Sequence, residues 1–299
     1  MKVRLSVLII TKNNEETIEK TIESVKNFDE IIVVDSCSTD KTREKVHKVG
    51  TGYYPVRTKV FVKGFDDIGK QRAYGLKYAT GDWVLILDSD EIMSKELARE
   101  IKVTLRQAQG DKTDREGDKT DREGDKTDRE GDKHVMVSLT NHNITAYEIP
   151  FQSYFLGRPL RYGGEDYYQI RLIKKDSVDI LLSLVHNRFR IKKGKIGKLK
   201  GNIHHYSYRS IGQVYRKFTD YAFKTAQIKA EISERSSLKK IFLYPLHMFW
   251  SRFIKDKGYK DGLFRIPLDL GFAYMEWLTY CLLAISNVKT QISNLNRKS

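Results

Sequence analysis

The chain has 299 residues, of which 40% are apolar, and its formal net charge is +15. That apolar content is enough for a packed core and excludes a globally disordered chain. The two cysteines, Cys37 and Cys281, exclude a disulfide framework and a cysteine-based zinc site. The charge indicates an anionic partner, for which nucleic acid, a phosphorylated substrate and an acidic membrane surface are the three candidates.

Apolar runs alternate with segments of helical periodicity in the N-terminal part of the chain. The expected strands are "RLSVLII", "EIIVVDS", "TKVFVKG" and "DWVLILD", and the expected helices are "EETIEKTIESVKNF", "STDKTREKVHKV" and "DDIGKQRAYGLKYA". Strand–helix alternation with continuous apolar strands predicts an α/β fold with a parallel, doubly wound sheet. In such sheets ligands bind beyond the carboxyl ends of the strands.

Polar residues follow three of these strands. The run "WVLIL" leads directly into Asp88, Asp90 and Glu91, Asp35 ends the second strand, and residues 11–14 follow the first. We therefore expect three polar clusters on one edge of the sheet. Carboxylates this close repel one another, so either water solvates them or a cation lies among them. Oxygen ligands suit Mg²⁺ or Mn²⁺, which also bind substrate phosphates.

The segment "DKTDREG" occurs three times in tandem over residues 111–131. The repeat contains no apolar residue, so it cannot form a coiled-coil seam or stack as a repeat array. We interpret residues from about 107 to 134 as a solvated, disordered insert.

The C-terminal part combines a basic run with aromatic helices. Residues 188–200, "RFRIKKGKIGKLK", contain no acid and are either solvated surface or a contact for lipid phosphate or nucleic acid. Residues 210–232 have a helical pattern, and aromatic-rich stretches occupy 238–255 and 263–287. These stretches are either amphipathic segments in a membrane interface, anchored by Trp, Tyr, Lys and Arg, or an ordinary helical subdomain packed on the sheet.

Four stretches together resemble the family-2 glycosyltransferases of GT-A fold, with the lipopolysaccharide-core β-glucosyltransferase branch as the nearest likeness. They are "SVLIITKNNEETIEKTIESV", "DEIIVVDSCSTDKT", "KQRAYGLKYATGDWVLILDSDE" and "IHHYSYRS". The resemblance covers nearly the whole chain apart from the insert. It implies a Rossmann-like, mostly parallel central sheet in a GT-A domain over residues 1–208, followed by a helical, membrane-associated region over 209–299.

The resemblance also implies roles for individual residues. Positions that bind the nucleotide of a nucleotide-sugar donor are matched by Thr11, Asn13, Asp35, Arg72 and Asp88. Asp88 and Asp90 match the Asp-x-Asp pair, with Asp90 as the direct ligand of a divalent metal, Mg²⁺ or Mn²⁺. His205 in "IHHYSY" matches a position that supplies an imidazole to the metal or to the diphosphate.

The implied reaction is a single displacement with inversion, in which a carboxylate deprotonates the acceptor hydroxyl. Asp166 is our first candidate for this base and Glu165 the second, because the pair follows two glycines in "RYGGEDYYQ". Relatives often carry a glutamate where this chain has Asn187. If that glutamate takes part in the reaction of the relatives, this chain lacks its contribution.

The sequence therefore predicts a metal-dependent hexosyltransferase that uses a UDP-sugar and a glycan acceptor carried on lipid or lipopolysaccharide. We expect it in the cytoplasm, peripheral on the inner face of the cell membrane. The alternatives are sugar transfer to a polyprenyl phosphate and an inactive scaffold for glycan assembly. The chain shows no nucleic-acid-binding signature, so we expect no nucleic-acid partner.

Overall fold

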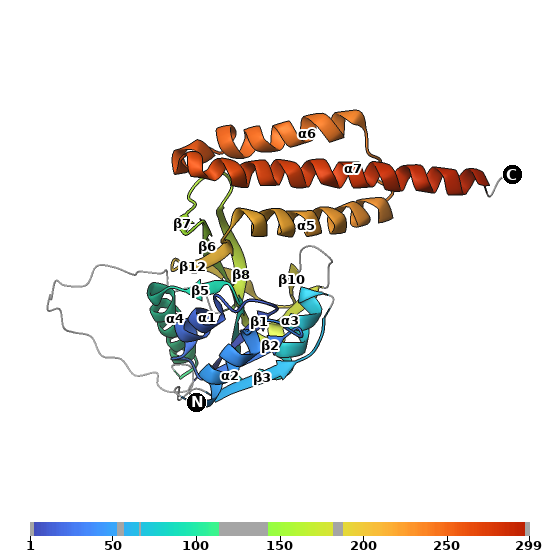
Figure 1. Ribbon diagram of the computed structural model, residues 1–299. Coiled ribbons are helices and arrows are strands. Elements are labelled where there is room, and N and C mark those ends of the chain that lie inside the picture. The colour runs from blue at the N-terminus through green and yellow to red at the C-terminus, as the bar shows by residue number, and fades with distance from the viewer. Residues whose placement is uncertain (1–2, 53–56, 66, 114–142, 182–187, 297–299) are drawn as a thin grey trace.

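The computed structural model describes residues 3–52, 57–65, 67–113, 143–181 and 188–296. A sheet flanked by helices forms one part of the molecule, and a layer of three long helices forms the other (Figure 1). Strands β6, β8 and β12 extend from the first part toward the second, so the two parts share a continuous backbone scaffold (Figure 1).

The N-terminal half is a parallel sheet, as the apolar runs predict. Its strands lie in the order β3-β2-β1-β4, and each neighbouring pair is parallel. The strands are β1 (Leu5–Thr11), β2 (Glu30–Asp35), β3 (Arg57–Val62) and β4 (Trp83–Asp88), and the helices are α1 (Ile18–Val25), α2 (Thr42–Gly52) and α3 (Ile68–Leu76). Buried apolar clusters cover both faces of β1, β2 and β4, which explains why these three strands read as continuous rather than alternating apolar runs, whereas no residue of the edge strand β3 is buried.

The sheet continues as β8-β6-β12-β5 and becomes mixed. Strand β8 runs antiparallel to both β4 and β6, and β5 is antiparallel to β12. Strand β6 runs parallel to β11 and β12, so the expected parallel pairing also recurs in this half beside the antiparallel pairs. The further elements are β5 (Glu91–Met93), α4 (Lys95–Thr113), β6 (Ile144–Phe155), β7 (Arg158–Pro159), β8 (Asp166–Lys174), β9 (Val178–Leu181), β10 (Arg188–Ile191), β11 (Lys195–Lys198) and β12 (Ile203–Tyr208).

Helices α5 (Ile211–Glu231), α6 (Leu238–Trp250) and α7 (Ile266–Asn296) form the helical layer. Helix α7 packs against both α5 and α6. A separate apolar cluster joins this layer to the sheet: Phe155 and Leu160 pack with Val214, Phe218 and Leu268. Short helical turns connect α6 to α7 over Ser251–Lys255, Gly258–Asp261 and Leu263–Arg265.

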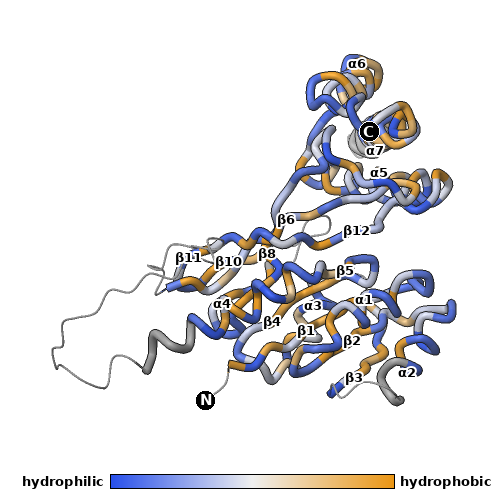
Figure 2. The backbone as a smooth tube through the Cα atoms, turned by 90° about the vertical axis from the view of Figure 1, so that its left-hand side faces the viewer, coloured by the Kyte–Doolittle hydropathy of each residue, from blue (hydrophilic) through white to orange (hydrophobic). Residues whose placement is uncertain are grey.

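Helix α6 presents an apolar face that no other described element covers. None of its residues is buried, and Leu238, Phe242 and Leu246, at i+4 spacing, are 74%, 61% and 68% exposed. Hydrophobic stretches recur along α6 and α7 in the tube view (Figure 2). By length and composition alone, Leu263–Asn287 is the one stretch of the described residues that is long and apolar enough to cross a membrane.

Helix α4 continues to Thr113, past the expected start of the insert at about residue 107. The first three residues of the first repeat thus belong to the helix. Residues 114–142, which contain the rest of the repeats, lie outside the described residues.

Candidate active site

The three polar clusters predicted at strand ends lie side by side. Thr11 is the register partner of Asp35 across β1 and β2, and Ile10 is the partner of Asp88 across β1 and β4. The side-chain amide of Gln71 on α3 donates to the carbonyls of Thr11 and Val34, at 3.1 and 2.7 Å. The carboxyl ends of β1, β2 and β4 therefore form one edge, and α3 holds the first two together.

The loops after β1 and β2 are joined through short polar side chains. Asp35 is fully buried and accepts from the backbone amide and the hydroxyl of Ser38, at 2.7 and 2.5 Å. Asn13 adopts a left-handed backbone conformation, and its Oδ1 accepts from the amide of Thr39 at 2.8 Å. In this structure Asp35 and Asn13 thus hold the loop geometry at the predicted nucleotide edge.

Asp88 lies between two arginines from different parts of the chain. Its Oδ1 accepts from Arg72 on α3 at 2.7 Å, and its Oδ2 lies 3.4 Å from Arg171 on β8. Burial by itself would raise the pKa of Asp88, but Arg72 and Arg171 outweigh it and hold the pKa well below its usual range. Asp88 is therefore a carboxylate with two arginines beside it, and these arginines offset part of the negative charge at this edge.

Glu91 supports the turn that carries the Asp-x-Asp pair. It is fully buried, its Oε2 accepts from the backbone amide of Asp88 at 2.9 Å, and its Oε1 contacts Arg171. Burial raises the pKa of Glu91 to about 7, even with Arg171 beside it. Its role in this structure is to fix the turn from within the core.

Arg171 reaches this cluster because of a β-bulge. Leu172 pairs with Tyr147 and Ile170 pairs with Glu148, so Arg171 is the extra residue of β8 at the shift in register. A bulge re-aims side chains, and here the guanidinium points to Asp88 and Glu91 while it lies over the ring of Phe151. The sequence analysis missed this residue, although an arginine within the apolar run "IRLI" was a signal for it.

Asp90 is held near β12 by backbone and side-chain contacts. Its carbonyl accepts from the amide of Tyr206 at 2.9 Å, and its Oδ2 lies 3.6 Å from Nε2 of His205. Burial would raise the pKa of Asp90, but His205 outweighs it and lowers the pKa to about 2. The other ring nitrogen of His205 lies 3.3 Å from the hydroxyl of Tyr167 on β8. The predicted metal ligands Asp90 and His205 are therefore brought together.

The donor set of Asp90 and His205 fits a hard divalent cation that takes its remaining ligands from a substrate. Among the described residues, no three His, Cys, Asp or Glu side chains gather as a complete metal cage. Mg²⁺ in particular binds through one or two carboxylates plus phosphate oxygens rather than through an all-protein cage. A protein shell that leaves positions for substrate phosphate oxygens is thus the arrangement expected for such a metal.

The two candidate bases have different surroundings. Glu165 is 4% exposed and is paired with Arg252, which lies between α6 and α7. Asp166 begins β8, is exposed, and no partner of its carboxylate occurs among the described residues. Asp166 thus has the free carboxylate that a general base needs, whereas that of Glu165 is occupied.

Several buried polar atoms at this edge have no hydrogen-bond partner among the described residues. They are Oγ1 of Thr11, Nε of Arg72, and Nε and Nη1 of Arg171. Because buried polar groups are normally paired, such atoms need an explanation, and a bound polar ligand or ordered water is the usual one.

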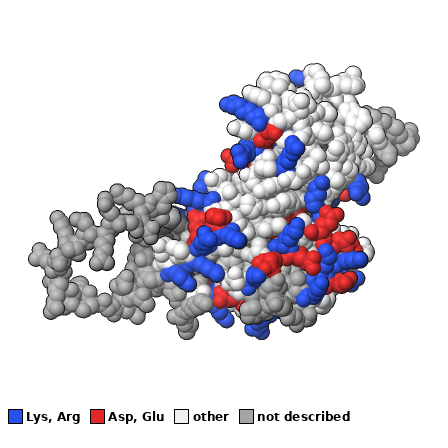
Figure 3. All heavy atoms as spheres, turned by 60° about the vertical axis from the view of Figure 1, so that its left-hand side comes forward, with Lys and Arg blue, Asp and Glu red and all other residues white. Residues whose placement is uncertain are grey.

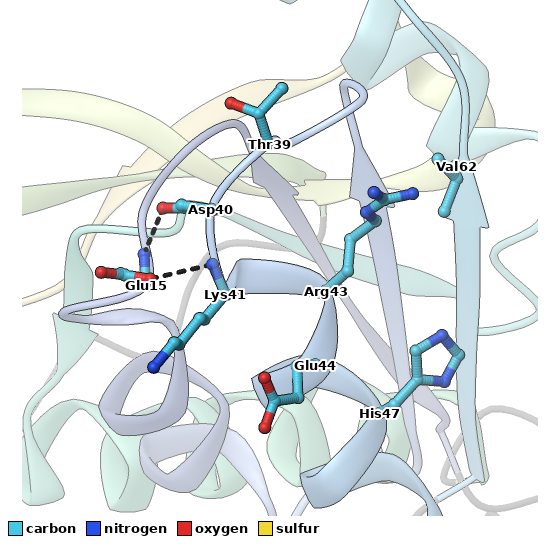
Figure 4. A pocket seen from close by; sticks show the side chains of 8 residues that line it. All are labelled: Glu15, Thr39, Asp40, Lys41, Arg43, Glu44, His47 and Val62. Atoms are coloured by element: carbon cyan, nitrogen blue, oxygen red, sulfur yellow. Dashed lines mark hydrogen bonds between the residues drawn. The ribbon is translucent and has the colours of Figure 1, made fainter.

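A shallow pocket of about 800 Å³ lies beside this edge, over the loops after β1 and β2 and the start of α2 (Figure 4). Glu15, Asp40 and Lys41 are joined there: the amide of Glu15 donates to Asp40, and the amide of Lys41 donates to Glu15 (Figure 4). Its lining mixes both signs of charge, with Arg43, Glu44 and His47 on α2. The Asp-x-Asp pair is not among the lining residues, so this pocket does not define the chemistry.

The basic run over 188–200 is partly neutralised by acids of the same region. Arg190 and Lys192 both pair with Asp179, and Nζ of Lys198 lies 3.7 Å from Glu148. Lys, Arg, Asp and Glu crowd over the sheet-containing part on the face shown in Figure 3, whereas the helical layer is mostly uncharged there. Residues 182–187, which include Asn187, lie outside the described residues.

The fold is α/β, and the carboxyl edge of its sheet gathers carboxylates with two arginines that have unpaired buried nitrogens among the described residues. The chain belongs to glycosyl transferase family 2, whose profile matches residues 6–156. Its mixed, curled α/β sheet is of the GT-A type, in agreement with the fold implied by the sequence motifs.

Relatives of the chain are also glycosyltransferases. An uncharacterized glycosyltransferase of Rickettsia typhi is 28% identical over 289 residues, which are 96% of this chain and 89% of the relative. The Staphylococcus aureus poly(ribitol-phosphate) beta-N-acetylglucosaminyltransferase TarS is 30% identical over 115 residues, 36% of this chain and 20% of the relative. A crystal structure of S. aureus TarS 1–349 in complex with UDP aligns over 96% of this chain and 92% of that chain, at 17% identity and a TM-score of 0.45.

Proposed function

We propose that the chain is an inverting, metal-dependent hexosyltransferase that moves a sugar from a UDP-sugar to a glycan acceptor carried on lipid, of the lipopolysaccharide type. The observation that carries the proposal is the strand register that sets Thr11, Asp35 and Asp88 side by side, with Asp90 two residues on. In a family-2 chain this edge is the expected binding position of the nucleotide sugar.

The donor's diphosphate finds positive charge at this edge. Arg72 and Arg171 converge on Asp88, and each has at least one buried nitrogen without a partner among the described residues. Guanidinium groups bind phosphate oxygens through paired hydrogen bonds. We propose that Thr11, Asn13 and the loop after Asp35 bind the nucleoside, and that Arg72 and Arg171 bind the phosphates.

Asp90 and His205 would hold Mg²⁺ or Mn²⁺ together with the diphosphate. When bound, the metal stabilises the negative charge of the departing nucleoside diphosphate. The contact between His205 and Tyr167 orients the imidazole toward Asp90 in the structure as it stands.

Asp166 is the general base of the proposed reaction. Its exposed carboxylate takes the proton of the acceptor hydroxyl, and the oxygen then attacks the anomeric carbon as the bond to the diphosphate breaks. Attack from the side opposite the leaving group inverts the configuration of the transferred sugar. One base and one displacement are sufficient, so no covalent enzyme intermediate is required.

The apolar face of the helical layer supports a peripheral position on the inner face of the cell membrane. The exposed Leu238, Phe242 and Leu246 of α6 adjoin Trp250, which is 49% exposed, and a turn in which Lys255, Lys257 and Lys260 are exposed. Apolar side chains with aromatic and basic neighbours are the composition of interfacial helices. We test this with phosphatidylglycerol and phosphatidylcholine vesicles: we expect co-sedimentation with the former and its loss in Leu246→Asp, and equal recovery of the two proteins would contradict it.

Donor binding is tested by thermal shift with UDP, GDP and ADP, each with and without Mn²⁺. We expect UDP with Mn²⁺ to raise the unfolding temperature most, because a ligand that binds only the native state stabilises it. Asp90→Asn removes a metal ligand at constant size, and Asp179→Asn, on the exposed hairpin of β9 and β10, is the matched control. Absence of any shift with UDP and Mn²⁺ in the natural chain would sink the donor assignment.

The acceptor is tested with radiolabelled UDP-glucose and two lipid fractions. One contains lipopolysaccharide-type glycolipid and the other polyprenyl phosphate alone. Label in the glycolipid alone supports the proposal. Label in the polyprenyl phosphate overturns the acceptor class and establishes the alternative reaction.

A further inference from the structure

The loop that leads into the candidate base is attached to the helical layer by three backbone amides, two backbone carbonyls and the side chain of Glu165. This loop, residues 160–165, joins β7 to β8. The backbone amides of Arg161 and Tyr162 both donate to Asp261, at 3.1 to 3.2 Å. The amide of Gly163 donates to the carbonyl of Asp256 at 2.8 Å. Residues 256 and 261 both lie in the connection between α6 and α7.

Arg265, directly before α7, lies on the opposite side of this attachment. It is fully buried, and it donates to the carbonyls of Tyr162 and Gly163 at 2.7 and 3.0 Å. It also donates to Asp261 and, twice, to Asp269, at 2.8 to 3.1 Å. All three nitrogens of the guanidinium are therefore bonded, and its charge is balanced by two carboxylates.

Gly163 shows how closely the loop and Arg265 fit. Its φ of +66° favours glycine, and a Cβ at this position would lie 2.1 Å from Nη2 of Arg265. The loop can approach the arginine only without a side chain at this residue.

Arg252 extends the attachment to the residue next to the base. Its guanidinium pairs with Glu165, donates to Asp269 at 3.1 Å, and stacks over the ring of Phe272 with its carbon 3.6 Å from the ring centre. Asp269 thus accepts hydrogen bonds from both Arg252 and Arg265. Arg252 links this group to the sheet through its ion pair with Glu165, which directly precedes β8. Asp166 follows directly and pairs with Gln152 at the start of β8.

Resting on the function proposed above, we propose that Arg252, Arg265 and Glu165 are positioning residues that set the place of the Asp166 carboxylate relative to the donor. Glu165 is then an ion-pair partner and not the base. The helical layer is part of the catalytic geometry, because a displacement of the loop by about 1 Å is enough to cost about a hundredfold in rate.

The first test compares two neighbouring carboxyl groups. Rates are measured as UDP released from UDP-glucose in the presence of the glycolipid fraction, for Glu165→Gln and Asp166→Asn. Glutamine still accepts a hydrogen bond from Arg252, so we expect Glu165→Gln to keep at least about a tenth of kcat, whereas Asp166→Asn loses about a thousandfold. A loss in Glu165→Gln as deep as that in Asp166→Asn would overturn the proposal.

The second test removes the arginine that contacts Glu165. We expect Arg252→Met to lower kcat by about a hundredfold with the KM for UDP-glucose nearly unchanged, and Arg252→Lys to recover part of the loss. Lys224→Met, an exposed charge change on α5, is the matched control. Hydrogen exchange of the amides of residues 161–163 should accelerate in Arg252→Met and Arg265→Met but not in the control.

The outcomes separate this proposal from the proposed function. If UDP with Mn²⁺ fails to stabilise the natural chain, the function itself fails. If UDP stabilises Arg252→Met as it does the natural chain and kcat is also unchanged, the donor site stands and the positioning role is refuted.

Discussion

The sheet edge around Asp88 and the junction around Arg265 both bury arginines among carboxylates, but they satisfy them differently. At the junction every nitrogen of Arg265 is bonded to a described partner. At the sheet edge two nitrogens of Arg171 and one of Arg72 have none. Complete pairing fixes a geometry, whereas incomplete pairing at the end of parallel strands leaves capacity for a polar ligand. The hydrogen bonding of the buried arginines therefore distinguishes the structural junction from the candidate binding site.

Removing Arg265 is the strongest way to break this comparison. We expect Arg265→Met to destabilise the chain by about 3–5 kcal/mol, because it leaves Asp261 and Asp269 buried without their main partner. The measurement is urea unfolding followed by circular dichroism. Arg190→Met, whose side chain is 64% exposed, should change stability by less than about 1 kcal/mol. Equal midpoints for the two variants would show that the junction has no structural role.

Asp90→Asn should have the opposite profile, with a large loss of activity and a small change in stability. We expect kcat to fall about a hundredfold to a thousandfold, because asparagine would hold the divalent metal more weakly and the metal would supply the positive charge that stabilises the departing diphosphate. The unfolding midpoint without ligand should fall less than in Arg265→Met, because Asp90 contacts His205 at 3.6 Å, whereas Asp269 is paired with both Arg252 and Arg265. Rates and ligand-free melting are measured on one preparation, and a variant that melts early yet turns over normally would reverse the assignment.

Glu30 at the start of β2 and Glu234 after α5 extend the comparison of the sheet with the helical layer to the effects of pH and salt. Burial would raise the pKa of Glu30, but Lys59, Ser6 and Thr80 outweigh it and lower the pKa to about 2. In Glu234, hydrogen bonds from Lys229 and Lys240 lower the pKa to about 2 as well. Both folded-state values lie below the ordinary 4.5, so the stability each carboxylate adds is complete above pH 4.5 and is lost as pH falls toward 2.

Salt should distinguish the two glutamates. The Glu30 side chain is 4% exposed and that of Glu234 is 24% exposed, so added salt screens Glu234 more. Glu30→Gln and Glu234→Gln are unfolded with urea at pH 7 and at pH 3, with and without about 1 M NaCl, at which the Debye length is about 3 Å. We expect the cost of Glu234→Gln, at most about 1 kcal/mol, to shrink in salt and that of Glu30→Gln to persist. A uniform response to salt would contradict the assigned difference in burial.

The sequence predicted the parts of the structure whose signals are local. Thr11, Asp35 and Asp88 each end an apolar run, and the rule for parallel strands places such ends together, as the register shows. The runs "EETIEKTIESVKNF" and "DDIGKQRAYGLKYA" predicted helices from their periodicity, and they contain α1 and α3. Where one residue type and its immediate neighbours decide the conformation, reading the chain was sufficient.

The sequence did not predict features that depend on distant partners. Glu165 and Arg252 are 87 positions apart, and nothing near either residue identifies the other. The bulge that aims Arg171 arises from pairing between β6 and β8, which the sequence locates only approximately. The three-residue strand β5 is stabilised by its pairing with β12, so its own short sequence contains no strand signal.

The smallest effect is expected from the acidic and basic repeats. Deleting residues 118–131 leaves α4, which ends at Thr113, and all the residues of the proposed site in place. Because the entropy of closing a loop changes slowly with its length, we expect stability to change by less than about 0.6 kcal/mol and turnover to stay within about twofold. The check is melting temperature and UDP release, with a Gly/Ser replacement of equal length as control. Loss of turnover in the deletion but not in the replacement would mean that loop length matters, and loss in both would assign a role to the repeat's charges, which neither structural region accounts for.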